Sequence, residues 1–133
     1  MRRATSTTIM DEPLVMALAT RQLAAYNAAD LKAFVDCFHP EVVVLNADGS
    51  VAHRGKKAFR ATYATMFATY TEVYAEVTER VVLGEHLIEK ESWSRVHGET
   101  GEKLAGEVLV RWSELGGLLR WVQFLRPAST LVA

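Results

Sequence analysis

The sequence predicts a single domain of the α+β class. Apolar residues recur at helical spacing through most of the first half of the chain, whereas from Thr71 onward they alternate with polar residues. Helices first and an antiparallel meander afterwards is the order of α+β proteins, not of parallel βαβ ones. The 133 residues, half of them hydrophobic, suffice for one domain with a core. We expect this domain at 11–127, between a flexible N-terminal tail (1–10) and a C-terminal tail (128–133).

Composition argues against several functional classes. The formal net charge of −1 does not favour a nucleic-acid or membrane-surface partner. No apolar run approaches the roughly 20 residues needed to span a bilayer. The N-terminal arginines are not followed by the apolar segment of a secretion signal. Cys37 is the single cysteine, which excludes an internal disulfide and a cysteine-based zinc site and favours a reducing, cytoplasmic compartment.

Three helices are predicted before the strand meander. The first starts at Asp11–Pro13, where acidic residues and proline suit a helix N-terminus, and its apolar stripe includes Gln22. Asp30 is the expected N-cap of the second helix, which Pro40 ends. The third follows Gly55. The core-facing residues expected in the second and third helices are Leu31, Phe34, Val35, Phe38, Phe59, Tyr63, Met66 and Phe67.

Five strands are predicted at 41–46, 73–83, 86–96, 104–113 and 118–125, and glycines mark the breaks between the later ones. Apolar or aromatic residues occur at both parities of the late strands, so the sequence pattern does not determine which face of these strands points inward. A two-fold homodimer through the outer sheet face would bury the surplus apolar surface. The alternative cover is the C-terminal tail.

One set of spaced residues carries a family resemblance. Asn27, Asp30, Leu31, Phe38, Gly55 and Tyr63 align without a gap with ketosteroid isomerases. The chain thereby resembles the nuclear transport factor 2-like superfamily, which includes these isomerases and the SnoaL-like polyketide cyclases. The resemblance covers about Leu14 to Arg126. It implies a cone-shaped fold, with three N-terminal helices packed on one curved, mostly antiparallel sheet, an apolar pocket and a dimer through the sheet.

The family's catalytic acids are replaced at the matching positions. Gln22 stands in place of a hydrogen-bonding tyrosine, Asn46 in place of the proton-shuttling aspartate, and Leu109 in place of a late-strand aspartic acid. An amide accepts no proton at neutral pH and so cannot serve as a general base. The Asp–Arg–Asp set of the superfamily's epoxide hydrolases is also not intact. The chain is therefore not expected to be a standard ketosteroid isomerase.

A ligand pocket is still expected inside the cone. Gln22, Asn46 and Tyr63 form a neutral polar trio, and buried polar groups without partners cost on the order of 1–3 kcal/mol each. Their convergence indicates a bound small hydrophobic molecule, since such sites combine apolar walls with a few polar groups. The alternative is that the trio bonds to itself or to backbone. The expected apolar walls are Tyr26, Phe38, Phe67, Trp93 and Trp121.

Two glutamates are the candidate proton-transfer groups. Glu107 lies two residues from the family's late-strand acid, and Glu91 shares a strand face with Glu89, Trp93 and Arg95. A cavity would raise the pKa of either carboxyl by desolvation. The alternative for Glu107 is an ion pair with an arginine. His53 and His97 are expected to face water, and the absence of close histidine pairs argues against a metal site.

Three functions remain open from these observations. The first is a SnoaL-like enzyme that isomerises, cyclises, dehydrates or hydrates an apolar oxygenated substrate. No organic cofactor is expected, because the chain has no glycine-rich phosphate-binding loop. The second is a non-catalytic hydrophobic-ligand-binding or dimerisation module. The third is a protein-interaction domain, which would need a large exposed aromatic patch.

Overall fold

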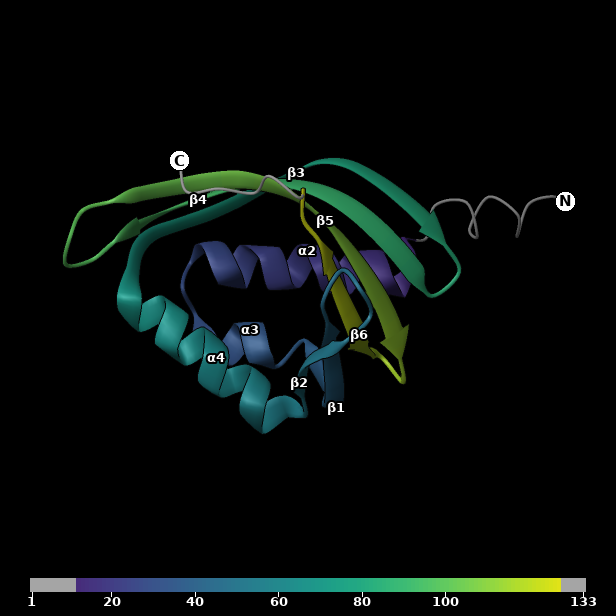
Figure 1. Ribbon diagram of the computed structural model, residues 1–133. Helices are drawn as coiled ribbons and strands as arrows, with labels where there is room; N and C mark the ends of the chain where they lie inside the picture. The colour runs from purple at the N-terminus through teal and green to yellow at the C-terminus, as the bar shows by residue number, and fades with distance from the viewer. Residues whose placement is uncertain (1–11, 128–133) are drawn as a thin grey trace, which may run out of the picture.

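A computed structural model describes residues 12–127, so the two predicted tails lie outside the described residues. A six-stranded sheet has the order β2-β1-β6-β5-β4-β3, and only the β1–β6 pair within it is parallel. The sheet curves over α2, and the helices lie on its concave side (Figure 1). An α+β fold with a curved, mostly antiparallel sheet is thus confirmed. The strands are β1 (Phe38–Leu45), β2 (Val51–Arg54), β3 (Tyr70–Leu83), β4 (His86–His97), β5 (Lys103–Leu115) and β6 (Leu118–Leu125).

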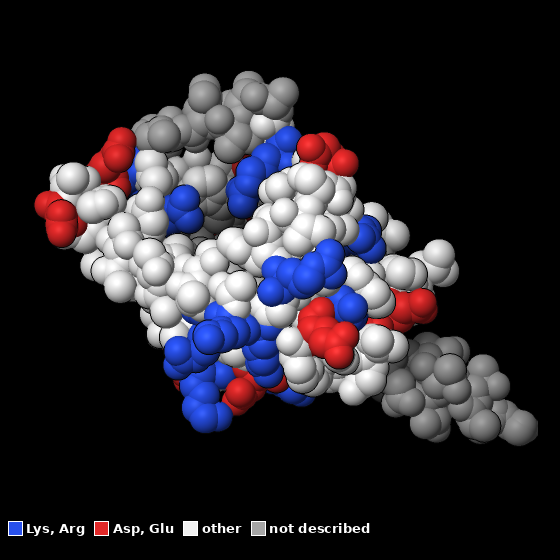
Figure 2. Space-filling view, turned by 60° about the horizontal axis from the view of Figure 1, so that its bottom comes forward, with Lys and Arg blue, Asp and Glu red and all other residues white. Residues whose placement is uncertain are grey.

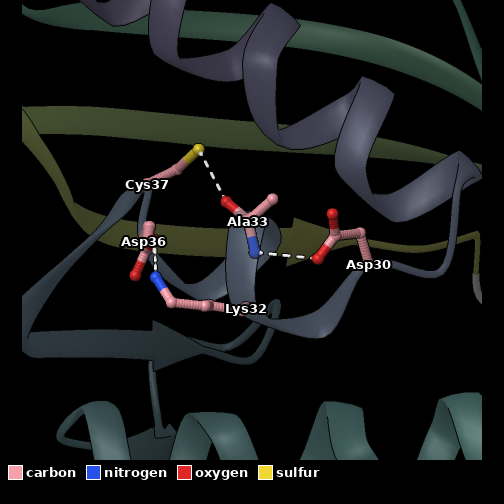
Figure 3. A network of polar contacts seen from close by, with 5 residues as sticks. All are labelled: Asp30, Lys32, Ala33, Asp36 and Cys37. Carbon is pink, nitrogen blue, oxygen red and sulfur yellow. Dashed lines mark hydrogen bonds and ion pairs between the residues drawn. The ribbon is translucent and has the colours of Figure 1, made fainter.

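Three helices occur in the described part of the chain: α2 (Leu14–Asn27), α3 (Leu31–Val35) and α4 (Lys56–Thr69). The helix α4 follows β1 and β2, so the helices do not form one block ahead of the sheet. Asp30 caps α3 as predicted, because its carboxylate accepts a 3.1 Å hydrogen bond from the Ala33 backbone N–H (Figure 3).

The second helix is shorter than the sequence predicts. It ends at Val35, and Phe38 is the first residue of β1 instead of the last core residue of the helix. Lys32 closes the short turn by pairing with Asp36 at 2.9 Å, and the Cys37 thiol donates to the Ala33 carbonyl at 3.6 Å (Figure 3). The spacing of Phe34 and Phe38 imitates a helix because both rings point into one core.

Aromatic rings fill the space between the helices and the sheet. The Phe34 ring lies 5.1 Å from Phe38, 5.7 Å from Phe59 and 4.6 Å from Tyr63, measured between ring centroids. Such ring pairs add about 0.5–1.5 kcal/mol each beyond the area that they bury. This cluster joins α3, β1 and α4 and forms the floor on which the pocket is built.

The end of α2 is bonded to the edge strand of the sheet. The Asn27 amide nitrogen donates to the Ala75 carbonyl at 3.0 Å, and its oxygen accepts from the Ala75 N–H at 2.8 Å. The bonds fall just beyond an irregularity of β3, where Glu72 has a φ of 54° and the register with β4 shifts. Asn27 therefore fixes the position of α2 relative to the sheet.

The strand register settles which late-strand side chains face inward. Glu91 of β4 pairs with Val108 of β5, and both are buried, whereas Ser92 pairs with Glu107, whose side chain is exposed. Residues directly opposite in an antiparallel pair point to the same side. Leu109 therefore faces outward, and Val108 and Val110 occupy the inner face.

Candidate active site

A cavity of about 660 Å³ opens between α2, α4, the turn after β1 and the inner face of β4, β5 and β6. Ligand sites of this size are typical for drug-sized molecules. On this face the surface is hollowed, and basic side chains stand beside the hollow (Figure 2). Its polar, charged and aromatic lining residues include Gln22, Tyr26, Asn46, His53, Thr62, Tyr63, Glu91, Trp93, Arg95, Trp112 and Arg126.

Of the predicted site residues, the cavity brings together Gln22, Tyr26, Asn46, Tyr63, Glu91 and Trp93. The other predicted wall residues do not line it. The Phe38 ring is fully buried in the aromatic cluster beneath, and Phe67 packs behind Tyr26 at 5.7 Å between ring centroids. Trp121 pairs with Ser113 and carries Arg120 at 4.4 Å over its ring.

Glu107 lies on the opposite face of the sheet, which corrects its expected orientation. Its side chain is 58% exposed, and Oε2 lies 3.7 Å from Nζ of Lys90. This is the ion-pair alternative, although the partner is a lysine and not an arginine. The expectation failed because β5 carries apolar residues at both parities, so its alternation did not identify the inner face.

Glu91 is the carboxyl group that the fold places in the cavity. The residue is only 9% exposed, and no hydrogen bond or ion pair to another residue of 12–127 holds it. Burial and, to a smaller extent, the nearby charge of Glu89 raise the pKa of Glu91 to about 7, against the opposing charge of Arg126. A carboxyl group with such a pKa exchanges protons readily near neutral pH.

The two amides of the predicted trio are bonded to protein. Gln22 is 4% exposed and donates from Nε2 to the Ala19 carbonyl at 2.9 Å, within its own helix. Asn46 donates to the Ser50 hydroxyl at 3.0 Å across a tight turn. The Gln22 amide thus bonds to backbone, which is the alternative to a bound ligand that the sequence left open. The Asn46 amide bonds to a side chain, and both residues line the cavity.

Tyr63 differs from the amides, because its hydroxyl has no hydrogen bond to the described residues. Burial raises the pKa of Tyr63, and the charges of Tyr26 and Glu91 raise it further. The hydroxyl therefore stays protonated and available as a donor at neutral pH. Tyr26 is held in place by a contact of 3.9 Å from its hydroxyl to the Met66 sulfur, and burial raises its pKa as well.

A second buried carboxylate group, that of Glu89, holds one of the cavity-lining residues in place. Glu89 is buried, its Oε1 accepts a 2.9 Å hydrogen bond from the Trp112 indole N–H, and its Oε2 lies 2.9 Å from Nη2 of Arg80. Because Glu89 and Glu91 lie two residues apart on one strand, they share the inner face. The buried pair also fixes Trp112, which lines the cavity.

Trp93 lies flat over a glycine. A Cβ atom added to Gly106 would come within 2.9 Å of Cζ2 of the Trp93 ring, so only glycine leaves room for the indole. The Trp93 indole nitrogen is buried and has no hydrogen-bond partner among residues 12–127. The ring therefore forms a flat wall with an unused donor at its edge.

Several lining residues were not expected at the site from the sequence. His53 was expected to face water, but it lines the cavity with Nε2 3.4 Å from the Thr62 hydroxyl. Arg126 follows the last strand and carried no sequence signal. Arg95 shares the face of Glu91 by simple alternation, which is the one signal that could have identified it.

No group of three or more His, Cys, Asp and Glu side chains among residues 12–127 is arranged to hold a metal ion. None of the helices described in this part of the chain is long and apolar enough to cross a membrane.

The fold and the cavity define a protein of the nuclear transport factor 2-like superfamily. The chain belongs to the SnoaL-like domain family, which it matches over residues 19–118. No curated protein matches the chain.

Solved structures share the fold. An uncharacterised cystatin-fold protein from Novosphingobium aromaticivorans is 25% identical, with a TM-score of 0.77 over 87% of this chain and 100% of that chain. A hypothetical ketosteroid isomerase-like protein from Catenulispora acidiphila, in complex with trimethylamine, is 16% identical, with a TM-score of 0.71 over 85% and 87%. An LEH-like epoxide hydrolase from M. tuberculosis is 11% identical, with a TM-score of 0.77 over 88% and 85%.

Proposed function

We propose that the protein is a SnoaL-like enzyme that moves a proton within an apolar, oxygenated substrate, with Glu91 as the acid and base. The observation that carries this proposal is the environment of Glu91. It is a buried carboxyl group on the wall of a large cavity, it is unpaired within residues 12–127, and its pKa is about 7. Structural carboxylates are ordinarily paired or solvated, whereas a perturbed, unpaired one in a pocket marks a functional site.

The proposed step is redox-neutral. The Glu91 carboxylate removes a proton from a carbon next to a carbonyl group, so that the C–H bond breaks and an O–H bond forms on Glu91. The electron pair of the broken bond moves to the carbonyl oxygen, which accepts a hydrogen bond from the Tyr63 hydroxyl. In a substrate with a carbon–carbon double bond next to this carbon, the carbonyl group re-forms, the double bond shifts, and the far carbon takes the proton from Glu91. This step completes an isomerisation and restores the Glu91 carboxylate.

Tyr63 is suited to this role because its pKa is raised by burial and it lacks a protein partner for its hydroxyl among the described residues. A neutral donor aimed at a developing negative charge stabilises the transition state more than the ground state. The aromatic residues Tyr26 and Trp93 supply apolar walls for the substrate body. No organic cofactor takes part in this scheme.

Hydrogen–deuterium exchange tests the proposal without knowledge of the natural substrate. The probe is 2-tetralone, an apolar bicyclic ketone, whose loss of α-protons in D₂O is followed by NMR near neutral pH. We expect exchange above the buffer rate with the wild type. The enzymatic part should fall by about 100-fold or more in Glu91→Gln, the usual contribution of a general acid or base.

Glu107→Gln is the matched control, because it removes a glutamate from the outer face of the same sheet. It should leave the exchange rate unchanged. Equal rates in wild type and Glu91→Gln would overturn the proposed role of Glu91. Binding of 2-tetralone with exchange no faster than in buffer would favour the non-catalytic ligand-binding module instead.

We also propose that two copies associate through the outer face of the sheet. This face exposes Val81, Ile88 and Leu109, at 71%, 40% and 41% respectively. Exposed apolar surface of this kind favours association. Sedimentation analysis should give a dimer for the wild type and a monomer for the double variant Ile88→Lys, Leu109→Lys. A monomeric wild type would contradict the proposal.

A further inference from the structure

We infer that the natural ligand carries a carboxylate group, bound between Arg95 and Arg126 at one end of the cavity. This deepens the proposed function, on which it rests, by naming the class of substrate as an apolar molecule with a single negative charge. The sequence suggested only a hydrophobic ligand. The charged groups that line the cavity indicate that the ligand also carries a charge.

Arg95 is held as a preformed anion-binding group. Its guanidinium carbon lies 4.4 Å from the centroid of the Tyr70 ring and 4.9 Å from that of Trp93. Stacking on aromatic rings uses the faces of the guanidinium and leaves its N–H edge available for a bidentate acceptor. Arg95 is on the cavity wall, and its Nε is buried without a hydrogen-bond partner in residues 12–127.

Arg126 adds a second positive charge at the same cavity. Its guanidinium carbon lies 5.3 Å from the centroid of the Phe124 ring, and both residues line the cavity. None of the ion pairs within the described range involves Arg95 or Arg126. Among the described residues that line the cavity, Glu91 is the only one with a carboxylate, so the wall carries more positive than negative charge.

The unused donors extend this site. The indole N–H of Trp93 is buried and unpaired within residues 12–127, and it belongs to the ring on which Arg95 stacks. Buried donors without acceptors carry a free-energy penalty that an acceptor on the ligand removes. The Trp93 N–H together with two arginines outside the described ion pairs, of which Arg95 has a buried Nε without an acceptor, matches the oxygens of a carboxylate group better than a neutral polar group.

A singly charged group fits this cavity better than a phosphate. Glu91 shares the cavity and carries a negative charge above its pKa of about 7, so it repels a dianion more strongly than a monoanion. With the carboxylate at the arginines, the apolar body of the ligand faces Tyr26, Tyr63 and Glu91. Glu91 and Arg95 lie four residues apart on β4, about 13 Å along an extended strand, so the reacting carbon and the anchoring group are separate parts of one molecule.

Calorimetric binding of three matched probes tests the inference at about pH 8, above the pKa of Glu91, where this group is charged and disfavours a dianion. The probes are naphthalene-2-carboxylate, the nearly isosteric neutral naphthalene-2-carboxamide, and 2-naphthyl phosphate. We expect the wild type to bind the carboxylate about tenfold more tightly than the carboxamide, since charge-assisted bidentate bonds are roughly twice as strong as neutral ones.

The double variant Arg95→Gln, Arg126→Gln should lose this preference and bind both probes with similar affinity. Arg95→Lys, which keeps the charge but not the planar fork, should keep part of it. Arg60→Gln is the control, because Arg60 is exposed on α4 and does not line the cavity. Thermal unfolding of each variant confirms that it is folded.

Equal affinity for the carboxylate and the carboxamide, a preference that survives in the double variant, or no binding of the carboxylate would overturn the inference. Tighter binding of the phosphate than of the carboxylate would overturn the assignment of a carboxylate group in favour of another anion. Glu91→Gln separates this inference from the proposed function, because it should abolish proton exchange and keep the carboxylate preference. If the preference is present and exchange is absent, only the catalytic proposal fails.

Discussion

The indole nitrogen of Trp112 donates a 2.9 Å hydrogen bond to Oε1 of Glu89, two residues before Glu91 on the same strand. The second oxygen of Glu89 faces Arg80 at 2.9 Å. A buried negative charge is thus held at a fixed place beside the carboxyl group that we propose to be catalytic. The pair Trp112–Glu89 connects a wall of the cavity with the protonation of Glu91.

Glu89→Gln should lower the pKa of Glu91. The charge of Glu89 is one of the causes that raise this pKa, and glutamine removes the charge while keeping an oxygen for the Trp112 N–H. The measurement is an NMR titration of the glutamate side-chain carboxyl carbons, with Glu91→Gln used for assignment. Glu107→Gln should leave the Glu91 titration in place. An unchanged pKa in Glu89→Gln would show that the two groups do not interact.

Glu91 should make folding less stable as pH rises. Its pKa in the folded state is about 7, above the ordinary 4.5, so the unfolded chain loses this proton first. Below about pH 4.5 the group has no effect; stability then falls until about pH 7 and stays constant above it. The full loss is roughly 3 kcal/mol, because each pH unit between the two pKa values contributes about 1.4 kcal/mol.

Urea unfolding of wild type and Glu91→Gln across this pH range measures the effect. The two proteins should have similar stability at low pH, and the variant should become the more stable one as pH rises. Glu89 is present in both proteins, so only the part of its titration that depends on the charge of Glu91 enters the difference. A constant difference between the two proteins at every pH would contradict the prediction.

Gly106→Ala should destabilise the protein by displacing Trp93. The added methyl group would meet the indole ring at 2.9 Å, and overpacking of this kind costs about 1–3 kcal/mol. The same substitution in a Trp93→Leu background should cost less, because the ring is gone. Unfolding free energies of the four proteins give the coupling, and additivity would show that ring and glycine do not interact.

Asn27→Ala should cost about 2 kcal/mol, because two hydrogen bonds to Ala75 are lost at about 1 kcal/mol each. Asn27→Asp keeps the acceptor for the Ala75 N–H and loses the donor, so its stability should be intermediate. Asn46→Ala, which removes one bond in an exposed turn, serves as the control with a smaller effect. Equal losses for the Asn27 and Asn46 variants would contradict the anchoring role.

Sequence periodicity predicted the fold well where one period dominated. The alternation after Thr71 placed the last three strands close to their observed bounds, and the Asp30 cap was predicted by residue type. The second helix failed at its end, because Phe34 and Phe38 lie four residues apart and yet belong to a helix and a strand. Spacing alone does not separate these cases when both side chains enter the same core.

The site residues were less predictable, because they depend on which alternate residues of each strand face the cavity. Glu91 and Glu107 were both candidates, and the register places one inside and the other outside. Apolar residues at both parities of β5 concealed this difference. Arg126 follows the end of β6, and His53 lies in the four-residue strand β2. Neither segment is long enough to show a periodic pattern from which the orientation of a side chain could be predicted.

The bond pair between Asn27 and Ala75 has a consequence for how the protein avoids aggregation. Strand β3 is an edge strand of the sheet, so its outer backbone groups would otherwise be available for pairing with a strand of another molecule. The Asn27 side chain takes both the N–H and the C=O of Ala75 at this border. A foreign strand cannot extend the sheet continuously there without first displacing the end of α2.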